Sequence, residues 1–241
     1  KQTMDALFGN RKIRLATLTD FSQISVSTKN HLKNVYTCLI LCMLSASAGA
    51  FLHLKGIFAQ SGFLSIIVSI GLMLWLAATS HSKENQTKRL CILTAFGGAM
   101  GLGLGPTLDF AVEVNPQIIM TAFLATTVIF ICFSLSALYA QRRSYLYLGG
   151  MLMSCLTLLM VTSLLNLFMR SFAVFQFGLY VGTFVFCGFV VYDTQLIVEK
   201  HQNGDNDYIW HSVDLFLDFI NIFRRLIIIL GLNEKKNKRN N

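Results

Sequence analysis

Seven long apolar runs occupy most of this 241-residue chain. They lie at about 35–54, 57–79, 90–112, 117–140, 145–168, 173–199 and 208–232. Most of them have the roughly 20 residues that a helix needs to cross the hydrocarbon core of a bilayer. The connections between them are short and leave no room for a second soluble domain. We therefore expect an all-α protein that crosses a membrane several times as a helical bundle.

The composition agrees with a membrane protein. Hydrophobic residues make up 54% of the chain and charged residues only 13%, with a mean hydropathy of +0.57. Soluble domains carry about 25% charged residues. The net charge of +8 could suggest a nucleic-acid partner. However, no basic stripe interleaved with aromatic residues is present, so we expect no nucleic-acid binding. The basic residues gather at the chain ends and in loops, which indicates contact with membrane lipid.

The Lys and Arg residues also predict the orientation of the chain. They are frequent in the N-terminal segment 1–34 and in every second loop, and rare in the other loops. Because cytoplasmic loops carry an excess of Lys and Arg, we expect segment 1–34 to be cytoplasmic. The bundle then spans 35–232, followed by a basic tail at 233–241. Seven full crossings would place this tail on the far side, whereas a re-entrant seventh run would keep it in the cytosol. We expect six spanning helices around a central seventh helix, which is either spanning or re-entrant.

All six cysteines fall within apolar runs, and none has the spacing of a CxxC motif or a metal site. We interpret them as small buried packing residues without disulfides. They are Cys38, Cys42, Cys91, Cys132, Cys155 and Cys187. Small residues also concentrate in segments 45–50 and 97–105, which predicts two helix faces that pack closely.

Three carboxylates lie inside apolar runs, namely Asp193, Asp214 and Asp218. A charge at the bilayer centre costs about 2.5–3.5 kcal/mol on insertion scales, so such residues usually serve ions, protons or catalysis. In the seventh run, five polar residues share one sector of roughly 80° on a helical wheel. They are His211, Asp214, Asp218, Asn221 and Arg225. We expect this face to point into the bundle, either as an ion or proton path or as a buried network that fixes packing.

Asp193 and Asp218 are separated by one short loop. Two neighbouring antiparallel helices would place them at similar depth. Two adjacent carboxylates cannot both ionise cheaply, so the pair should titrate as a unit and respond to pH. Protonated, the pair can share a hydrogen bond and close a path. Deprotonated, it offers oxygen ligands to calcium. Two or three carboxylates are few for tight binding, so we expect a transit or sensing site with transient calcium at Asp193 and Asp218. Calcium would be the transported ion, and we expect no resident cofactor.

Three segments carry a resemblance to a known family. They are Gly97-Gly-Ala-Met-Gly-Leu-Gly-Leu-Gly-Pro-Thr-Leu108, Val191-Tyr-Asp-Thr-Gln-Leu-Ile197 and Asp214-Leu-Phe-Leu-Asp-Phe-Ile-Asn-Ile-Phe223. They look like the signature segments of the transmembrane Bax inhibitor motif family. Segments 134–140 and 204–211 make the chain similar to a member of that family from the endoplasmic reticulum. The resemblance extends from about residue 31 to residue 234.

The resemblance implies a helical bundle with the last helix at its centre. It also implies a pH-sensitive calcium leak in the endoplasmic reticulum membrane that suppresses cell death under stress. The aspartate pair of the family maps onto Asp193 in Tyr-Asp-Thr-Gln and onto Asp218 in Phe-Leu-Asp-Phe. The partners that the resemblance implies are calcium, protons and membrane lipid.

Two other classes of function were weighed against an ion leak. An intramembrane aspartyl protease also needs two membrane aspartates, but its Gly-x-Gly-Asp and Pro-Ala-Leu motifs are absent. We therefore expect that the protein is not an enzyme. A membrane scaffold that binds death-regulator or calcium-channel proteins without conducting ions stays open. The short loop with Asp205 and Asp207 lacks the other ligand positions of an EF-hand, and we interpret it as hydrophilic and nothing more.

Overall fold

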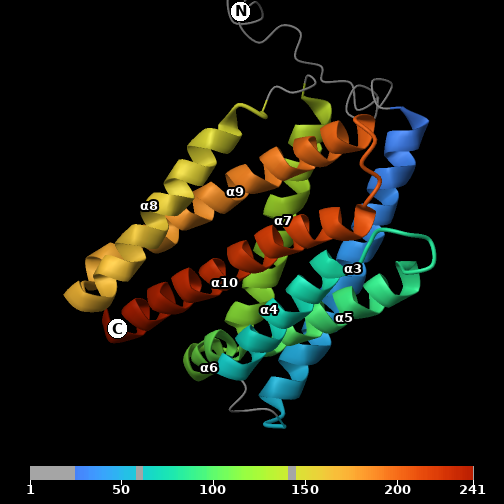
Figure 1. Ribbon diagram of the computed structural model, residues 1–241. Coiled ribbons are helices and arrows are strands. Elements are labelled where there is room, and N and C mark those ends of the chain that lie inside the picture. Colours follow the sequence, from blue (N-terminus) through green and yellow to red (C-terminus); the bar gives the residue numbers. More distant parts are fainter. Residues whose placement is uncertain (1–24, 58–61, 141–144, 241) are drawn as a thin grey trace, which may run out of the picture.

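The computed structural model describes residues 25–57, 62–140 and 145–240 (Figure 1). These residues form eight helices and no strand, as expected for an all-α protein. The helices are α3 (Val26–Leu54), α4 (Gly62–Ala78), α5 (Gln86–Gly103), α6 (Gly105–Val114), α7 (Gln117–Tyr139), α8 (Leu148–Met169), α9 (Phe172–Gln202) and α10 (Tyr208–Asn240). Most of the N-terminal segment 1–34 and the loop at 141–144 lie outside the described residues.

Four of the described helices, α3, α7, α8 and α9, are long and apolar enough to cross a membrane. Helices α5 and α6 together would add a fifth span, bent by 43° at the break between them. Helix α4 is a shorter apolar helix. The outer faces of these helices expose large apolar side chains, for example Phe168 at 88%. Such a surface suits lipid and not water, so the chain is a multi-pass membrane protein.

The run expected at 90–112 is divided into α5 and α6. The break falls at Leu104, and Gly105 and Pro106 begin the second helix. Proline has no backbone N–H and fits the first turn of a helix, so it ends one helix and starts the next. The third run is therefore a bent pair and not one straight helix.

Helices α3 and α5 pack through the two small-residue segments. A Cβ atom on Gly101 would lie 2.0 Å from the carbonyl oxygen of Ala46. A Cβ atom on Gly97 would lie 2.7 Å from the carbonyl oxygen of Cys42. Only glycine allows the two backbones to approach this closely. The predicted packing faces are confirmed.

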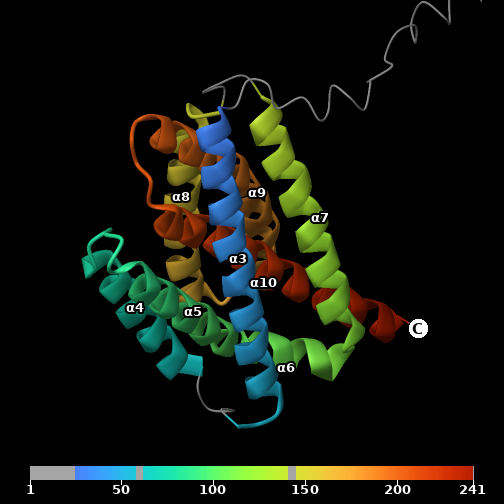
Figure 2. The ribbon, with the colours of Figure 1, turned by 90° about the vertical axis from the view of Figure 1, so that its right-hand side faces the viewer.

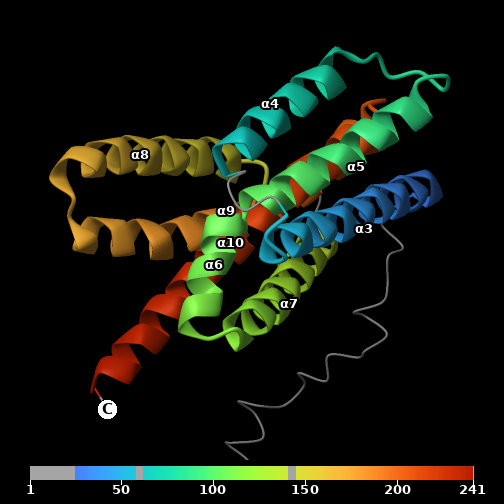
Figure 3. The ribbon, with the colours of Figure 1, turned by 90° about the horizontal axis from the view of Figure 1, so that it is seen from below.

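Helix α10 runs through the interior of the bundle (Figures 2 and 3). It packs against α3, α5, α6, α7 and α9, and Phe216, Ile222 and Ile227 on it are fully buried. Helix α4 packs mainly on α5, and α8 packs mainly on α9. The expectation of six helices around a seventh is therefore met only in part. The central helix is enclosed by α3, α5, α6, α7 and α9, and α4 and α8 form an outer layer.

Helix α10 is one continuous helix of 33 residues, so the basic tail at 233–241 continues it through Asn240. Near its end, the amino group of Lys238 donates a hydrogen bond of 2.6 Å to the carbonyl of Val114 at the end of α6. The end of α10 therefore lies beside the connection between α6 and α7. Helix α10 is not among the helices that are long and apolar enough to cross a membrane, so whether the seventh run spans or re-enters stays a prediction.

The cysteines differ in exposure. Cys38, Cys42 and Cys187 are buried and Cys155 is half-buried, whereas Cys91 and Cys132 are exposed. The prediction of six buried cysteines was therefore wrong for the last two. They lie on the outward sides of α5 and α7. A free cysteine behaves as a small hydrophobic residue, so its contact with lipid is as favourable as burial in the protein.

Candidate functional site

The site is centred on the interface between α9 and α10. These two helices lie side by side and are joined by a short loop (Figure 1). Asp193 on α9 and Asp218 on α10 face each other across it, with their carboxyl groups within hydrogen-bonding reach. Carboxylates are acceptors only, so a hydrogen bond between two of them requires that one carries a proton. The pair can therefore share a proton in this arrangement.

No ion pair to Asp218 is found among the described residues. Asp218 is only 4% exposed, and its Oδ2 atom finds no hydrogen-bond partner among the described residues. In the part of the chain that the structure describes, the ion pairs are formed by other carboxylates. Burial of a carboxylate without a cation costs free energy of folding, so a purely structural role would not favour such a residue.

Asp214 lies one turn before Asp218 on α10 and is half-buried. It is close enough to interact electrostatically with both Asp193 and Asp218. Lys200 on α9 interacts with Asp193 and Asp214, but it is the one cation set against three carboxylates at this point. The local charge is therefore acidic whenever the pair gives up its proton.

The carboxylates do not form a resident metal site. Within the described ranges, no group of three or more His, Cys, Asp or Glu side chains is placed to hold a metal ion. Calcium takes 6–8 oxygen ligands in a stable protein site.

Two further members of the predicted polar face of α10, Arg225 and Asn221, make contacts of their own. Arg225 lies 4.7 Å from the ring centre of Phe186 and contacts α9 at Gly182. The Asn221 amide donates a hydrogen bond of 2.8 Å to the Leu217 carbonyl of its own helix. These contacts do not involve the aspartate pair, and a supporting role of both residues stays a prediction. The face extends over about 21 Å of helix, so its members meet different neighbours at different depths.

His211, the first member of that face, belongs to a histidine cluster. Its Nδ1 atom lies 2.9 Å from Nε2 of His31 on α3, and the His31 ring stacks on His201 with centroids 4.2 Å apart. Its Nε2 atom lies 3.4 Å from a carboxylate oxygen of Asp205. Partial burial opposes ionisation of Asp205, but the Asp207 N–H and nearby His211 hold its pKa below the ordinary value. The sequence does not reveal this cluster because its members are up to 180 residues apart.

The loop before α10 carries an ion pair that the sequence interpretation missed. Arg89 is 3% exposed and donates two hydrogen bonds, of 2.9 Å and 2.6 Å, to the carboxylate of Asp207. Asp207 also accepts a hydrogen bond of 3.1 Å from the backbone N–H of Trp210. The interpretation of this loop as hydrophilic and nothing more was therefore wrong. An Asp just before an apolar helical run is a helix N-cap signal, which could have indicated its role.

Comparison with known proteins identifies the family. The family described as "Inhibitor of apoptosis-promoting Bax1" matches residues 28–235. "Probable Bax inhibitor 1" of Paralichthys olivaceus is 55% identical over 230 residues, which covers 95% of this chain and 97% of that protein. "Bax inhibitor 1" of Homo sapiens is 55% identical with the same coverage. The protein of that name from Arabidopsis thaliana is 41% identical over 95% of this chain and 92% of its own length. The chain therefore belongs to the family of inhibitors of apoptosis-promoting Bax1.

Proposed function

We propose that this protein is a pH-sensitive calcium leak of the endoplasmic reticulum membrane, which lowers the lumenal calcium load and suppresses cell death under stress. The observation that carries the proposal is the pair formed by half-buried Asp193 and buried Asp218, whose carboxyl groups lie within hydrogen-bonding reach and can share a proton. The names of its relatives, which describe inhibitors of Bax, support the part that concerns cell death. The endoplasmic reticulum is the location that the family resemblance implies.

The described arrangement corresponds to the closed state of the proposed leak. Asp218 is buried, and next to it Phe219 packs edge-on against Phe130 and Phe123 at centroid distances of 5.7 Å and 6.0 Å. These rings pack beside the residue that carries the buried carboxylate. The shared proton ties α10 to α9 at the same depth. A proton on the pair therefore keeps the path closed.

Loss of the shared proton would open the path. Two unit charges about 4 Å apart repel by about 4 kcal/mol at an effective dielectric constant of about 20. This repulsion replaces the hydrogen bond between Asp193 and Asp218 and favours separation of α9 from α10. The exposed carboxylates, with Asp214 beside them, then stabilise a calcium ion in transit. The leak should accordingly rise with pH.

The experiment is calcium efflux from liposomes that contain the purified protein. Asp218→Asn removes the buried charge but keeps the shape of the side chain. We expect it to lower efflux by about tenfold, which corresponds to about 1.4 kcal/mol of lost stabilisation of the passing ion. The matched control is Glu113→Gln, which neutralises an exposed carboxylate at the end of α6 and should leave efflux unchanged.

Cells that express the same variants test the second half of the proposal. Asp218→Asn should raise the resting calcium content of the endoplasmic reticulum and reduce survival under stress, whereas Glu113→Gln should behave as the unmodified protein. A variant that lost efflux in liposomes but protected cells fully would contradict the link between leak and survival. It would favour a scaffold that binds death-regulator or calcium-channel proteins.

A further inference from the structure

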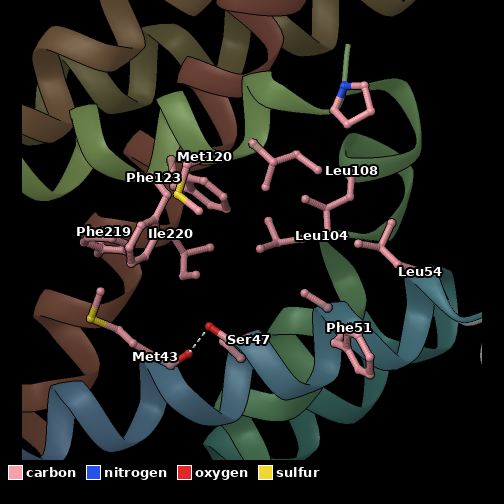
Figure 4. Close-up of a pocket in the computed structure, with 15 residues that line it drawn as sticks. Met43, Ser47, Phe51, Leu54, Leu104, Leu108, Met120, Phe123, Phe219 and Ile220 are labelled. Carbon is pink, nitrogen blue, oxygen red and sulfur yellow. Dashed lines mark hydrogen bonds between the residues drawn. The ribbon is translucent and has the colours of Figure 1, made fainter. Parts of the chain in front are cut away.

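An apolar groove opens on the side of the bundle between α3, α6, α7 and α10 (Figure 4). Its volume is about 460 Å³, within the range of about 300–1,000 Å³ that is typical of ligand sites. Figure 4 shows side chains from these helices, among them Met43, Leu108 and Phe219, around a common space. We call it the α3–α7 groove.

The mouth of the groove lies on the surface that faces lipid. Phe51 on α3 is 58% exposed and Met120 on α7 is 63% exposed, and both line the groove. Both helices are long and apolar enough to span a membrane. In a bilayer these side chains are exposed to hydrocarbon and not to water. The groove is therefore open to acyl chains.

The lining offers nothing to a polar ligand. Ser47 provides the one side-chain hydroxyl among the lining residues. That hydroxyl donates a hydrogen bond of 2.9 Å to the carbonyl of Met43 within α3 (Figure 4). A bound water needs two to four polar partners, and a polar ligand would lose its hydration without replacement. An occupant of this groove must be hydrocarbon.

The groove has the length of one leaflet. Along α3 it extends from Met43 to Leu54, which corresponds to about 16 Å at 1.5 Å per residue. The hydrocarbon core of a bilayer is about 30 Å thick, so each leaflet provides about half of that. One acyl chain can lie in the groove from end to end.

A positive charge lies at the outer end of the groove. Lys55 follows directly after Leu54, and its amino group lies 5.4 Å from the centre of the Phe51 ring. Pro116, at the connection between α6 and α7, lines the groove as well. The ends of spanning helices lie at the membrane interface, where a Lys side chain can reach lipid phosphates. The charge therefore complements a phospholipid head group.

We propose that the α3–α7 groove holds one acyl chain of a phospholipid, with the lipid phosphate next to Lys55. The chain lies against Phe219 and Phe223 of the central helix. Phe219 is the neighbour of Asp218 in the sequence, so this lipid contacts α10 directly beside the aspartate pair.

The test is photolabelling of the full chain in liposomes. The probe is a phosphatidylcholine with a photoactivatable diazirine in one acyl chain, and the labelled peptides are mapped by mass spectrometry. We expect saturable labelling of peptides with residues 43–54 and 116–123, which unlabelled phosphatidylcholine reduces. Labelling of these peptides that is non-saturable and no stronger than that of α8 would overturn the proposal, since it would mean bulk lipid contact only.

Filling the groove should displace the lipid. Ser47→Phe fills it from α3 and should lower labelling of residues 116–123 at least about tenfold, or about 1.4 kcal/mol of binding free energy. Ser154→Phe is the matched control, because Ser154 is an exposed serine of α8 with the same bond to the carbonyl four residues before it. Met120→Trp fills the groove from the opposite wall, so it replaces Ser47→Phe if that variant does not fold. Unchanged labelling in a folded groove-filling variant would contradict the proposal.

A second photoactivatable lipid tests the contribution of the head group separately from that of the acyl chain. Diacylglycerol with the same photoactivatable chain has no phosphate. It should label the groove less than the phospholipid does in the unmodified protein, and Lys55→Gln should abolish that difference. Equal labelling by both lipids in the unmodified protein would overturn the role of Lys55. Crosslinks from the groove to a second copy of the chain, in place of lipid, would overturn the assignment of the occupant.

Discussion

Two aspartates at the N-terminal end of α10, Asp207 directly before the helix and Asp218 within its first third, have opposite surroundings. Asp207 receives two hydrogen bonds from the buried guanidinium of Arg89 and caps the first turn of α10. Asp218 faces the carboxyl group of Asp193 instead, and no basic side chain among the described residues pairs with it. The same side chain is thus neutralised at one place and left without a cation at the other.

The different surroundings of Asp207 and Asp218 suggest different roles for two positions at the same end of α10. A carboxylate held by Arg with good geometry stabilises the fold as long as both partners are present, and removal of one partner is costly. A buried carboxylate next to another carboxylate contributes repulsion whenever both are ionised. Such an arrangement is retained where ions or protons are handled. We therefore propose that Arg89 and Asp207 anchor α10, and that Asp193 and Asp218 respond to protons.

The largest effect on stability is expected at the anchoring pair. Arg89→Met removes both hydrogen bonds and leaves Asp207 largely buried without its cation. We expect the free energy of unfolding to fall by about 3 kcal/mol. The measurement is thermal unfolding of the purified protein in one detergent. The matched control is Lys88→Met, because Lys88 is exposed and should change stability by no more than about 0.5 kcal/mol.

A double variant shows whether the loss comes from the uncompensated charge. Asp207→Asn added to Arg89→Met removes the carboxylate that Arg89 had neutralised. We expect part of the lost stability to return, because no unpaired charge remains. Additive losses from the two changes would show that Arg89 and Asp207 are not coupled, and the comparison between the two aspartates would fail.

A smaller effect of opposite sign is expected at the aspartate pair. Asp218→Asn removes like-charge repulsion at high pH, while its amide can still donate a hydrogen bond to Asp193 at low pH. We expect the variant to be more stable than the unmodified protein by about 1 kcal/mol at about pH 8, and equal to it near pH 5. Thermal unfolding at both pH values measures this. A loss of stability at both would mean that Asp218 is a structural residue like Asp207.

The smallest effect is expected at Asp205, on the surface of the same loop. Its pKa is lower in the folded protein than the ordinary value of 3.8, so ionised Asp205 stabilises the fold above about pH 4. This contribution is lost as the pH falls through the folded pKa. Asp205→Asn should cost less than about 1 kcal/mol at pH 6, because the side chain is 47% exposed and water screens its charge. The difference between the two proteins should shrink steadily as the pH is lowered below about 4, and a difference that does not change with pH would point to a lost hydrogen bond instead.

Much of the fold follows from the sequence for simple physical reasons. Each of the seven apolar runs corresponds to a helix or a bent pair, because a bilayer leaves the backbone no other way to satisfy its hydrogen bonds. Residues 45–50 and 97–105 pack together because only small side chains permit it. The positions of α4 and α8 in an outer layer were not predictable. In a membrane protein an outer helix and an inner helix can be equally apolar, so hydropathy does not indicate which helices lie in the outer layer.

The site was predictable where neighbours in the sequence are neighbours in space. Asp193 and Asp218 are linked by one short loop, so their approach follows from two antiparallel helices. The contacts of Arg89 and His31 were not predictable, since their partners are 118 and 180 residues away. A helical wheel also places Arg225 and Asn221 with the aspartates, but it ignores depth and the neighbouring helices that each side chain meets.

The pH midpoint of calcium efflux tests the shared proton most directly. Efflux is measured from liposomes between about pH 5 and pH 8 for the unmodified protein, Asp193→Asn and the control Glu113→Gln. Without a like charge at Asp193, Asp218 loses its proton more easily. The midpoint of Asp193→Asn should therefore move to lower pH by about one unit or more, as for coupled carboxyl groups. Glu113→Gln should keep the midpoint of the unmodified protein. Unchanged flux and an unchanged midpoint in Asp193→Asn would show that the pair is structural and would contradict a proton-gated leak.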